Sequence, residues 1–202
     1  MLKKIGELWE ELAALILSRG AFIRAKFLYE KMADYLPAEG QILDLCCKSG
    51  HIGTVIKYWE LKHNARHVAL LNIKCSCLHV AQWMFNAPCA RYLAETNNMG
   101  YASIEDDDPI PCQDRHFDCV LVAFAGPNRR TRELKHLLAE AVRVSKGYII
   151  VIDYTPGEGV HDYWVQMLRN LDMDIVHEES WTQPELFGLF QLPVTMFVLE
   201  KK

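Results

Sequence analysis

The feature that most constrains the fold is an alternation of short apolar strands with longer helical segments, which begins near Gln41 and continues toward the C-terminus. Apolar runs bounded by turn residues predict strands at Ile42–Leu45, His67–Ile73, Arg91–Ala94, Asp118–Phe124, Tyr148–Tyr154, Met173–Glu178 and Val194–Glu200. Apolar residues at helical spacing predict helices at Ile52–Tyr58, Leu78–Phe85, Arg132–Val144 and Val160–Leu171. Strands joined by helices need crossover connections, which indicates an α/β fold with a mostly parallel sheet.

The two ends of the chain depart from this alternation. Only a predicted loop, Ser180–Pro193, separates the last two strands, so we expect an antiparallel hairpin at one edge of the sheet. Two helices are predicted before the first strand, over Leu2–Leu17 and Phe22–Leu36. They could form a lid over an apolar acceptor, although amphipathic core packing also accounts for their aromatic residues.

The chain reads as one domain. No repeat, low-complexity stretch or linker divides it, so we expect a single domain over residues 1–202. Within it, a helical lid at 1–37 precedes an α/β core at 41–202.

Composition narrows the classes of function. A net charge of −4 and a pI near 6.1 argue against a nucleic-acid partner. The longest apolar runs, such as Tyr148–Ile152, are too short to span a membrane. The segment Met1–Lys4 is followed by Glu7 and Glu10 instead of an apolar signal core, so we expect a cytoplasmic protein with reduced cysteines.

The turn after the first strand has partial cofactor-loop character. Ser49, Gly50 and Gly53 keep some of the small residues that let a backbone approach a ligand and point N–H groups at an anion. Asp44, just before the turn, can accept hydrogen bonds from loop amides or from a ligand's ammonium group. A plain strand-to-helix turn with an aspartate cap explains the same pattern, so both interpretations stay open.

The end of the second strand carries an amide. Nucleoside-binding sites of this kind have an acidic residue there, which accepts hydrogen bonds from both ribose hydroxyls. Asn72 takes that place, and its amide can accept one such bond and donate another without the strengthening charge.

These residues resemble a known family. The segment Asp44–Gly50 is similar to the Asp-Leu-Cys-Cys-Gly-Ser-Gly loop of S-adenosylmethionine-dependent C-methyltransferases of ubiquinone and menaquinone biosynthesis, which are class I methyltransferases. Three further segments, Pro109–Asp118, Phe124–Arg129 and Leu138–Gly147, resemble motifs of that family in order and spacing. The resemblance covers roughly Phe27–Pro156 and implies a Rossmann-like, seven-stranded, mostly parallel sheet with an antiparallel edge hairpin.

The resemblance also implies a cofactor, S-adenosylmethionine, bound over the ends of the first strands. It places the cofactor's methionine moiety by Cys46, Lys48 and Gly50, its ribose by Asn72, and its adenine by Glu95 or Thr96. Asp44 and Phe124 complete the predicted cofactor-binding set. Lys48 replaces a glycine of the family and Asn72 replaces its acid, so cofactor binding is predicted to be weakened or lost.

Three hypotheses for function follow. The first is a methyltransferase that acts on a small molecule; no catalytic residue is assigned, since the candidate bases His51, His79, His116 and His161 show no diagnostic spacing. The second is an inactive methyltransferase-like pseudoenzyme that binds a protein partner or another ligand.

The third hypothesis is a metal site. Cys46, Cys47, Cys75 and Cys77 follow neighbouring predicted strands, and thiolates suit zinc or an iron–sulfur cluster. Adjacent cysteines on a strand face opposite sides, however, and the spacing is not that of C-x-x-C sites, so buried thiols without metal are the preferred interpretation.

Overall fold

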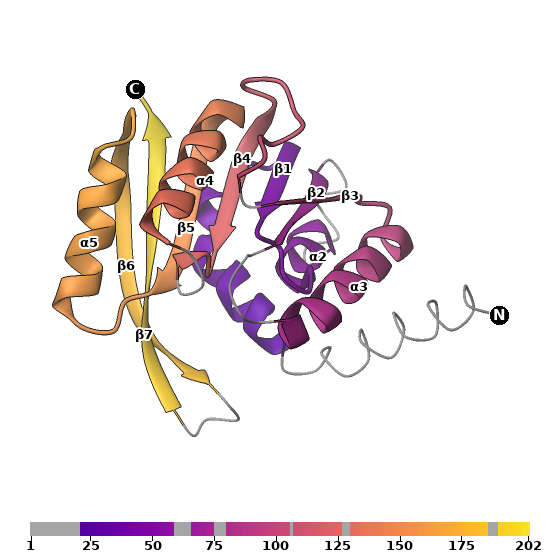
Figure 1. Ribbon diagram of the computed structural model, residues 1–202, viewed down its shortest axis with the longest axis horizontal. Helices are drawn as coiled ribbons and strands as arrows, with labels where there is room; N and C mark the ends of the chain where they lie inside the picture. The colour runs from indigo at the N-terminus through magenta and orange to yellow at the C-terminus, as the bar shows by residue number, and fades with distance from the viewer. Residues whose placement is uncertain (1–20, 59–65, 75–79, 106, 127–129, 186–189) are drawn as a thin grey trace. The chain divides into compact units, whose positions relative to one another are not determined.

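The computed structural model describes residues 21–58, 66–74, 80–105, 107–126, 130–185 and 190–202. Its strands form a seven-stranded mixed sheet in the order β3-β2-β1-β4-β5-β7-β6, with helices in the connections (Figure 1). This confirms the predicted α/β fold. The chain divides into two compact units, Met1–Asp108 and Pro109–Lys202, which are described in turn as the first and second unit.

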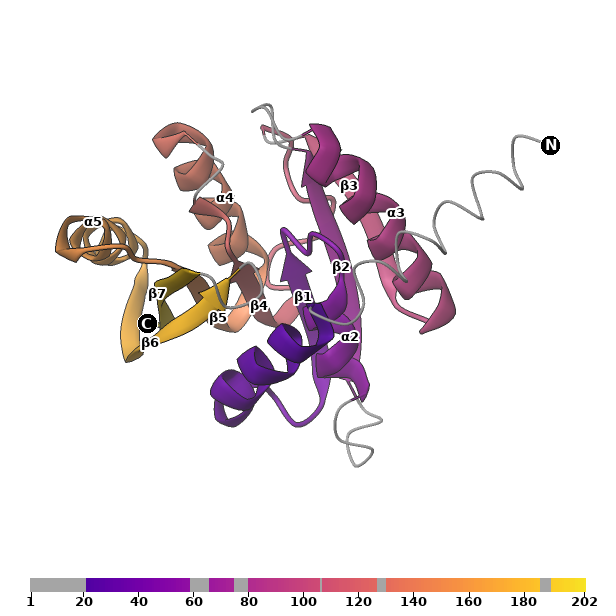
Figure 2. The same cartoon turned by 90° about the horizontal axis from the view of Figure 1, so that it is seen from below.

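The first unit contains three parallel strands, β1 (Gly40–Leu45), β2 (Arg66–Lys74) and β3 (Gly100–Glu105). Helix α2 (His51–Tyr58) connects β1 to β2, and helix α3 (Val80–Thr96) connects β2 to β3 (Figure 2). Both crossovers step the same way across the sheet, so right-handed connections put both helices on one face. The strands are parallel, so their carboxyl ends meet at one edge of this sheet.

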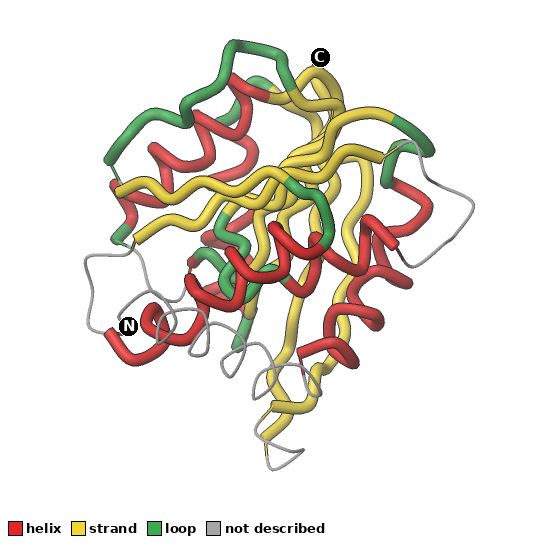
Figure 3. The backbone as a smooth tube through the Cα atoms, turned by 90° about the vertical axis from the view of Figure 1, so that its right-hand side faces the viewer, coloured by secondary structure: helices red, strands yellow, loops and turns green. Residues whose placement is uncertain are grey.

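The second unit combines parallel and antiparallel pairing. Strand β4 (Phe117–Ala123) runs parallel to β5 (Ser145–Tyr154). The last two strands are antiparallel, β6 (Met173–Glu185) and β7 (Phe190–Lys201), and β7 also pairs antiparallel with β5 (Figure 3). Helices α4 (Thr131–Val144) and α5 (Glu158–Arg169) complete the unit.

The predicted edge hairpin is confirmed, but its predicted loop was too long. Strand pairing continues through Ser180 and Thr182 to Glu185, which pairs with Phe190. The segment Ser180–Pro193 was assigned to a loop because of its polar residues and prolines, yet an edge strand tolerates proline and faces solvent on one side.

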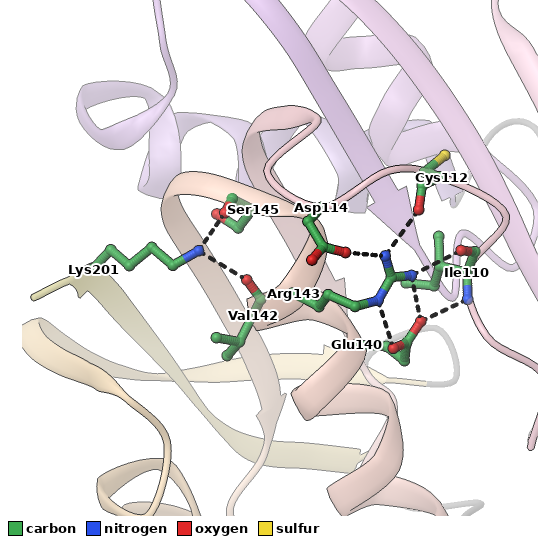
Figure 4. A network of polar contacts seen from close by, with 8 residues as sticks. All are labelled: Ile110, Cys112, Asp114, Glu140, Val142, Arg143, Ser145 and Lys201. Atoms are coloured by element: carbon green, nitrogen blue, oxygen red, sulfur yellow. Dashed lines mark hydrogen bonds and ion pairs between the residues drawn. The ribbon is translucent and has the colours of Figure 1, made fainter.

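Arg143 anchors the segment before β4 onto α4 (Figure 4). Its guanidinium donates to the carbonyl oxygens of Ile110 and Cys112, both at 2.9 Å, and to the Asp114 carboxylate at 2.8 Å. Glu140 accepts two further bonds from Arg143, at 2.8 and 2.7 Å, and one from the Ile110 N–H at 2.8 Å. The charged groups of Arg143 and Glu140 are paired with each other and with the backbone of the segment before β4, which identifies this network as a structural anchor.

The predicted strand Arg91–Ala94 is wrong, because α3 continues through it to Thr96. Buried residues recur at helical spacing over this stretch, at Ala87, Ala90, Ala94, Cys89 and Leu93. Pro88 lies inside the helix and suggested a break that the tertiary packing overrides. The third strand is instead β3, which lies at the edge of the sheet and has no fully buried residue.

The N-terminal prediction is tested only in part. Residues 21–32 are helical and continue into a 3-10 turn at Ala33–Tyr35, close to the predicted Phe22–Leu36. The predicted helix Leu2–Leu17 lies outside the described residues. In the described part of the chain, no helix has both the length and the apolar character needed to cross a membrane.

Candidate cofactor-binding site

The loop between β1 and α2 has left-handed backbone at three alternate positions. The φ angles are 65° at Cys46, 48° at Lys48 and 76° at Gly50. Left-handed backbone costs a residue with a side chain about 1 to 2 kcal/mol, so Cys46 and Lys48 are both strained. The loop therefore keeps the conformation of a glycine-rich turn although two of its residues are not glycine.

Close packing fixes this loop at the start of α2. The Cys47 N–H donates to the Leu71 carbonyl at 3.2 Å, and the Gly50 N–H donates to the Cys47 carbonyl at 2.7 Å. A Cβ atom at Gly50 would lie 2.9 Å from Leu70 Cδ1, and one at Gly53 would lie 2.3 Å from Leu70 Cδ2. Glycine at these two positions lets the N-terminus of α2 approach the sheet closely.

Asp44, the fifth residue of β1, points a carboxylate at the same helix terminus. Its side chain is fully buried, and Oδ2 accepts the Gly53 N–H at 2.9 Å. Oδ1 is also buried and has no hydrogen-bond partner among the described residues. Burial raises the pKa of this carboxyl to about 7, and the bond from Gly53 opposes the rise.

His51, the first residue of α2, has a second buried polar atom without a hydrogen-bond partner among the described residues. Its side chain is 3% exposed, and its ring meets the Phe22 ring edge-on at a centroid distance of 4.7 Å. Nδ1 lies 2.9 Å from Ser49 Oγ, whereas Nε2 is buried without a hydrogen-bond partner among the described residues. Burial lowers the pKa of His51 to about 4, so the imidazole is neutral at pH 7.

Native proteins leave few buried polar atoms unpaired, and each such atom calls for an explanation. At the N-terminus of α2, Asp44 Oδ1 and His51 Nε2 are two such buried atoms without a hydrogen-bond partner among the described residues. Sequence reasoning named Asp44 as a cofactor residue and His51 only as one of several histidines. What distinguishes His51 from the other histidines is its buried nitrogen without a hydrogen-bond partner among the described residues, and only the folded structure reveals this.

The other strand ends of the first unit define the same edge of the sheet. Asn72 lies in β2, two residues before its end, and its backbone pairs with Ser103. Glu105 ends β3 opposite Lys74. Asn72 thus lies near the carboxyl ends of the strands, as its predicted role requires, and Glu105 is an acidic residue at that edge that the sequence prediction did not include.

Glu95 and Thr96 lie elsewhere than predicted. Both are exposed residues in the last turn of α3, and Thr96 Oγ1 donates to the Tyr92 carbonyl at 2.8 Å. They were assigned to the adenine because they were expected to follow a strand. The helix removes that reason, since the strand ends are where ligands bind in sheets of this kind.

In the second unit, Phe124 directly follows β4. Its φ is 55°, its N–H donates to the Ile152 carbonyl at 2.7 Å, and its ring packs on Tyr154 at 4.8 Å. Asp153, which is 1% exposed, holds the next turn by accepting the Gly126 N–H at 2.6 Å. The sequence prediction did not include Asp153.

The described thiols are poorly suited to metal. Cys46, Cys47 and Cys89 are buried, and burial raises the pKa of Cys47 well above its usual range and that of Cys89 to about 12. In the absence of a metal, Cys47 and Cys89 are therefore protonated at pH 7. Among the described residues, no group of three or more candidate ligands could hold a metal ion. Cys75 and Cys77 lie outside the described residues.

Two of the remaining candidate bases have partners of their own. His116 stacks edge-on against Phe117 at 4.8 Å, and His161 pairs with Glu178 at 2.7 Å, so both have structural partners within the second unit. His79 lies outside the described residues. His51 is a candidate base that the structure places at the start of α2, directly after the loop that follows β1.

Solved structures share this architecture across most of the chain. The PH0226 protein of Pyrococcus horikoshii OT3 is 15% identical, with 92% of each chain covered and a TM-score of 0.69. A SAM-dependent methyltransferase of Methanosarcina mazei is 13% identical, with 86% of this chain and 97% of that chain covered and a TM-score of 0.63. The chain has the Rossmann-like fold of class I methyltransferases.

A third similar structure is the magnesium protoporphyrin IX methyltransferase of Synechocystis PCC 6803 with bound SAH (S-adenosylhomocysteine). It is 9% identical, with 91% of this chain and 84% of that chain covered and a TM-score of 0.62. No protein-family model matches the sequence, and no curated protein matches it either. At sequence identities of 9 to 15%, structural similarity establishes the fold but not the reaction, which depends on the residues of the site.

Proposed function

We propose that this protein is an S-adenosylmethionine-dependent methyltransferase that acts on a small molecule. The observation that carries the proposal is the loop after β1, which keeps left-handed backbone at Cys46 and Lys48 at the expense of strain. Strained backbone persists where function requires it. A plain turn with an aspartate cap would need neither the strain nor the open oxygen of Asp44.

The chemistry of Asp44 and of the α2 terminus supports this cofactor. The buried Oδ1 of Asp44 is an acceptor without a partner among the described residues, which suits the cofactor's α-ammonium group. The first amides of α2 point out of the helix terminus and favour an anion, which suits the α-carboxylate. Asn72 would contact the ribose, accepting one hydroxyl bond and donating another.

When bound, the cofactor supplies an electrophilic methyl group on a sulfonium. The chain's part is to hold that ligand in line with an acceptor and to exclude water. The family resemblance also assigns Phe124 to cofactor binding, and the quinone-biosynthesis branch rests on that resemblance alone. We therefore propose only that the methyl acceptor is a small molecule.

A second candidate function has specific support. Lys48 stands where the family has glycine, and Asn72 stands where it has an acid. Both replacements are compatible with a chain that keeps the fold and no longer binds the cofactor. In that case the protein would be an inactive methyltransferase-like domain that binds a protein partner or another ligand. The two functions differ in whether the wild-type protein binds the cofactor.

Calorimetric titration with S-adenosylhomocysteine distinguishes them. We expect saturable one-site binding by the wild type, and tighter binding by the Lys48→Gly, Asn72→Asp double variant, because the variant restores the glycine and the ribose-binding acid. Each single variant serves as a control for the other. Binding by the double variant alone would contradict the proposal and support the inactive domain.

A further inference from the structure

His51 has an unexplained nitrogen. Its Nε2 atom is buried and lacks a partner among the described residues, while Nδ1 contacts Ser49 Oγ at 2.9 Å. A buried polar atom without a partner costs about 1 to 3 kcal/mol. Packing against Phe22 would be served equally by an apolar ring, so packing does not account for a histidine here.

The direction of the side chain places the ring of His51 at the N-terminus of α2. Side chains of a helix tilt toward its N-terminus, and His51 is the first residue of α2. Its contact with Ser49 shows that the ring reaches back over the loop. The positive end of the helix dipole and the outermost amides lie there too, and both favour an anion.

The contact with Ser49 can set the tautomer. If the Ser49 hydroxyl donates to Nδ1, the neutral ring carries its proton on Nε2 and becomes a donor. The ring is neutral at pH 7 because burial lowers the pKa of His51 to about 4. A neutral donor beside a helix N-terminus suits a carboxylate without adding a charge that would repel an ammonium.

We propose that His51 binds the amino-acid part of the ligand, with Nε2–H donating to its α-carboxylate while Asp44 Oδ1 accepts from its α-ammonium. His51 Nε2 and Asp44 Oδ1 would then bind the negative and the positive group of one zwitterion. This inference rests on the proposed function, because S-adenosylmethionine and S-adenosylhomocysteine both carry such a group. It makes His51 a specificity residue for the amino-acid end of the cofactor.

The test compares two ligands on two variants. S-adenosylhomocysteine carries the amino-acid group, and 5′-methylthioadenosine lacks it but keeps the nucleoside. His51→Asn retains an amide near the place of Nδ1, whereas His51→Gln reaches the place of Nε2. By calorimetry, we expect His51→Asn to weaken S-adenosylhomocysteine binding about tenfold, with less than about a twofold effect on methylthioadenosine. We expect His51→Gln to recover most of the lost affinity.

Each outcome has a distinct meaning. If His51→Asn weakens both ligands equally, or neither, His51 does not read the amino-acid group and the inference is wrong while cofactor binding stands. Retained binding of methylthioadenosine shows that a variant is folded. If the wild type binds neither ligand, the proposed function fails and this inference fails with it.

Discussion

Two buried aspartates, one in each unit, have nearly the same local geometry and opposite hydrogen-bond status. Asp44 accepts the Gly53 N–H at 2.9 Å, and Asp153 accepts the Gly126 N–H at 2.6 Å. In both cases a Cβ atom on the glycine would lie 3.0 Å from Oδ2. The second oxygen of Asp153 accepts the Tyr154 N–H at 2.7 Å, whereas that of Asp44 has no partner among the described residues.

The difference is that Asp153 has donors at both carboxylate oxygens, whereas Asp44 has a donor among the described residues at Oδ2 alone. Asp153 uses both oxygens to hold backbone, after β4 at Gly126 and at the end of β5 at Tyr154, so its charge is compensated by N–H donors. Asp44 is equally buried and has one donor, which leaves it with a pKa of about 7. An amide could keep the bond from the Gly53 N–H without a buried charge, so we expect asparagine to be more stable than aspartate at this position at neutral pH.

The largest expected effect is stabilisation by Asp44→Asn. The pKa of Asp44 is raised in the folded protein, from 3.8 to about 7, so the folded state holds a proton that the unfolded chain has lost between these pH values. The free energy of unfolding therefore falls as pH rises through that window. Chemical denaturation at pH 8 should show the variant more stable by up to about 4 kcal/mol, with the difference vanishing near pH 4.

Asp153→Asn is the matched opposite. Asparagine offers one acceptor where two N–H donors are now satisfied, so one buried donor loses its partner and faces an amide NH₂. We expect a loss of about 2 kcal/mol in the free energy of unfolding at pH 8. Equal and same-signed effects of the two substitutions would show that the two aspartates do not differ as described.

His51→Gln should expose a pH dependence of the opposite sign to that of Asp44. The pKa of His51 is lowered from 6.5 to about 4, so the unfolded chain binds a proton that the folded state excludes, and stability falls as pH drops through this range. Between pH 7.5 and 5 the wild type should lose about 2 kcal/mol relative to the variant. Denaturation of both proteins across this range measures it; a constant difference would contradict the burial of a neutral ring.

The smallest expected effect comes from the strained loop. Lys48→Gly relieves left-handed backbone but adds freedom to the unfolded chain, so the net stabilisation should be about 0.5 kcal/mol. Arg115 has a similar φ of 54° in the second unit and gives a matched control. We expect Arg115→Gly to change stability by a similar amount without altering S-adenosylhomocysteine affinity, which Lys48→Gly should increase.

The sequence predicted what depends on local pattern. The apolar runs of β1, β4 and β5 were found near their predicted bounds, and the edge pair β6 and β7 was found with longer strands than predicted. The boundary between α3 and β3 was missed because a proline interrupts a helix that tertiary packing holds together. Glu95 and Thr96, predicted to follow a strand and contact the adenine, therefore lie in the last turn of α3.

The candidate site was predicted less completely for a different reason. Asp44, Cys46, Lys48 and Gly50 are adjacent in sequence, so a motif could find them. Asp153 and the role of His51 depend on which hydrogen bonds the fold completes and which it leaves open. That accounting requires coordinates, because no spacing in the sequence records whether a buried atom has a partner.

The central claim, that the open oxygen of Asp44 receives a ligand ammonium, is tested most directly by counting protons. Calorimetric titration with S-adenosylhomocysteine at pH 7, in buffers of different ionisation enthalpy, measures the protons exchanged on binding. A carboxyl with a pKa of about 7 is half protonated there, and pairing with an ammonium makes it ionise, so about half a proton should be released. Asp44→Asn should release none. Binding by the wild type without proton release, or with release unchanged in the variant, would contradict the claim.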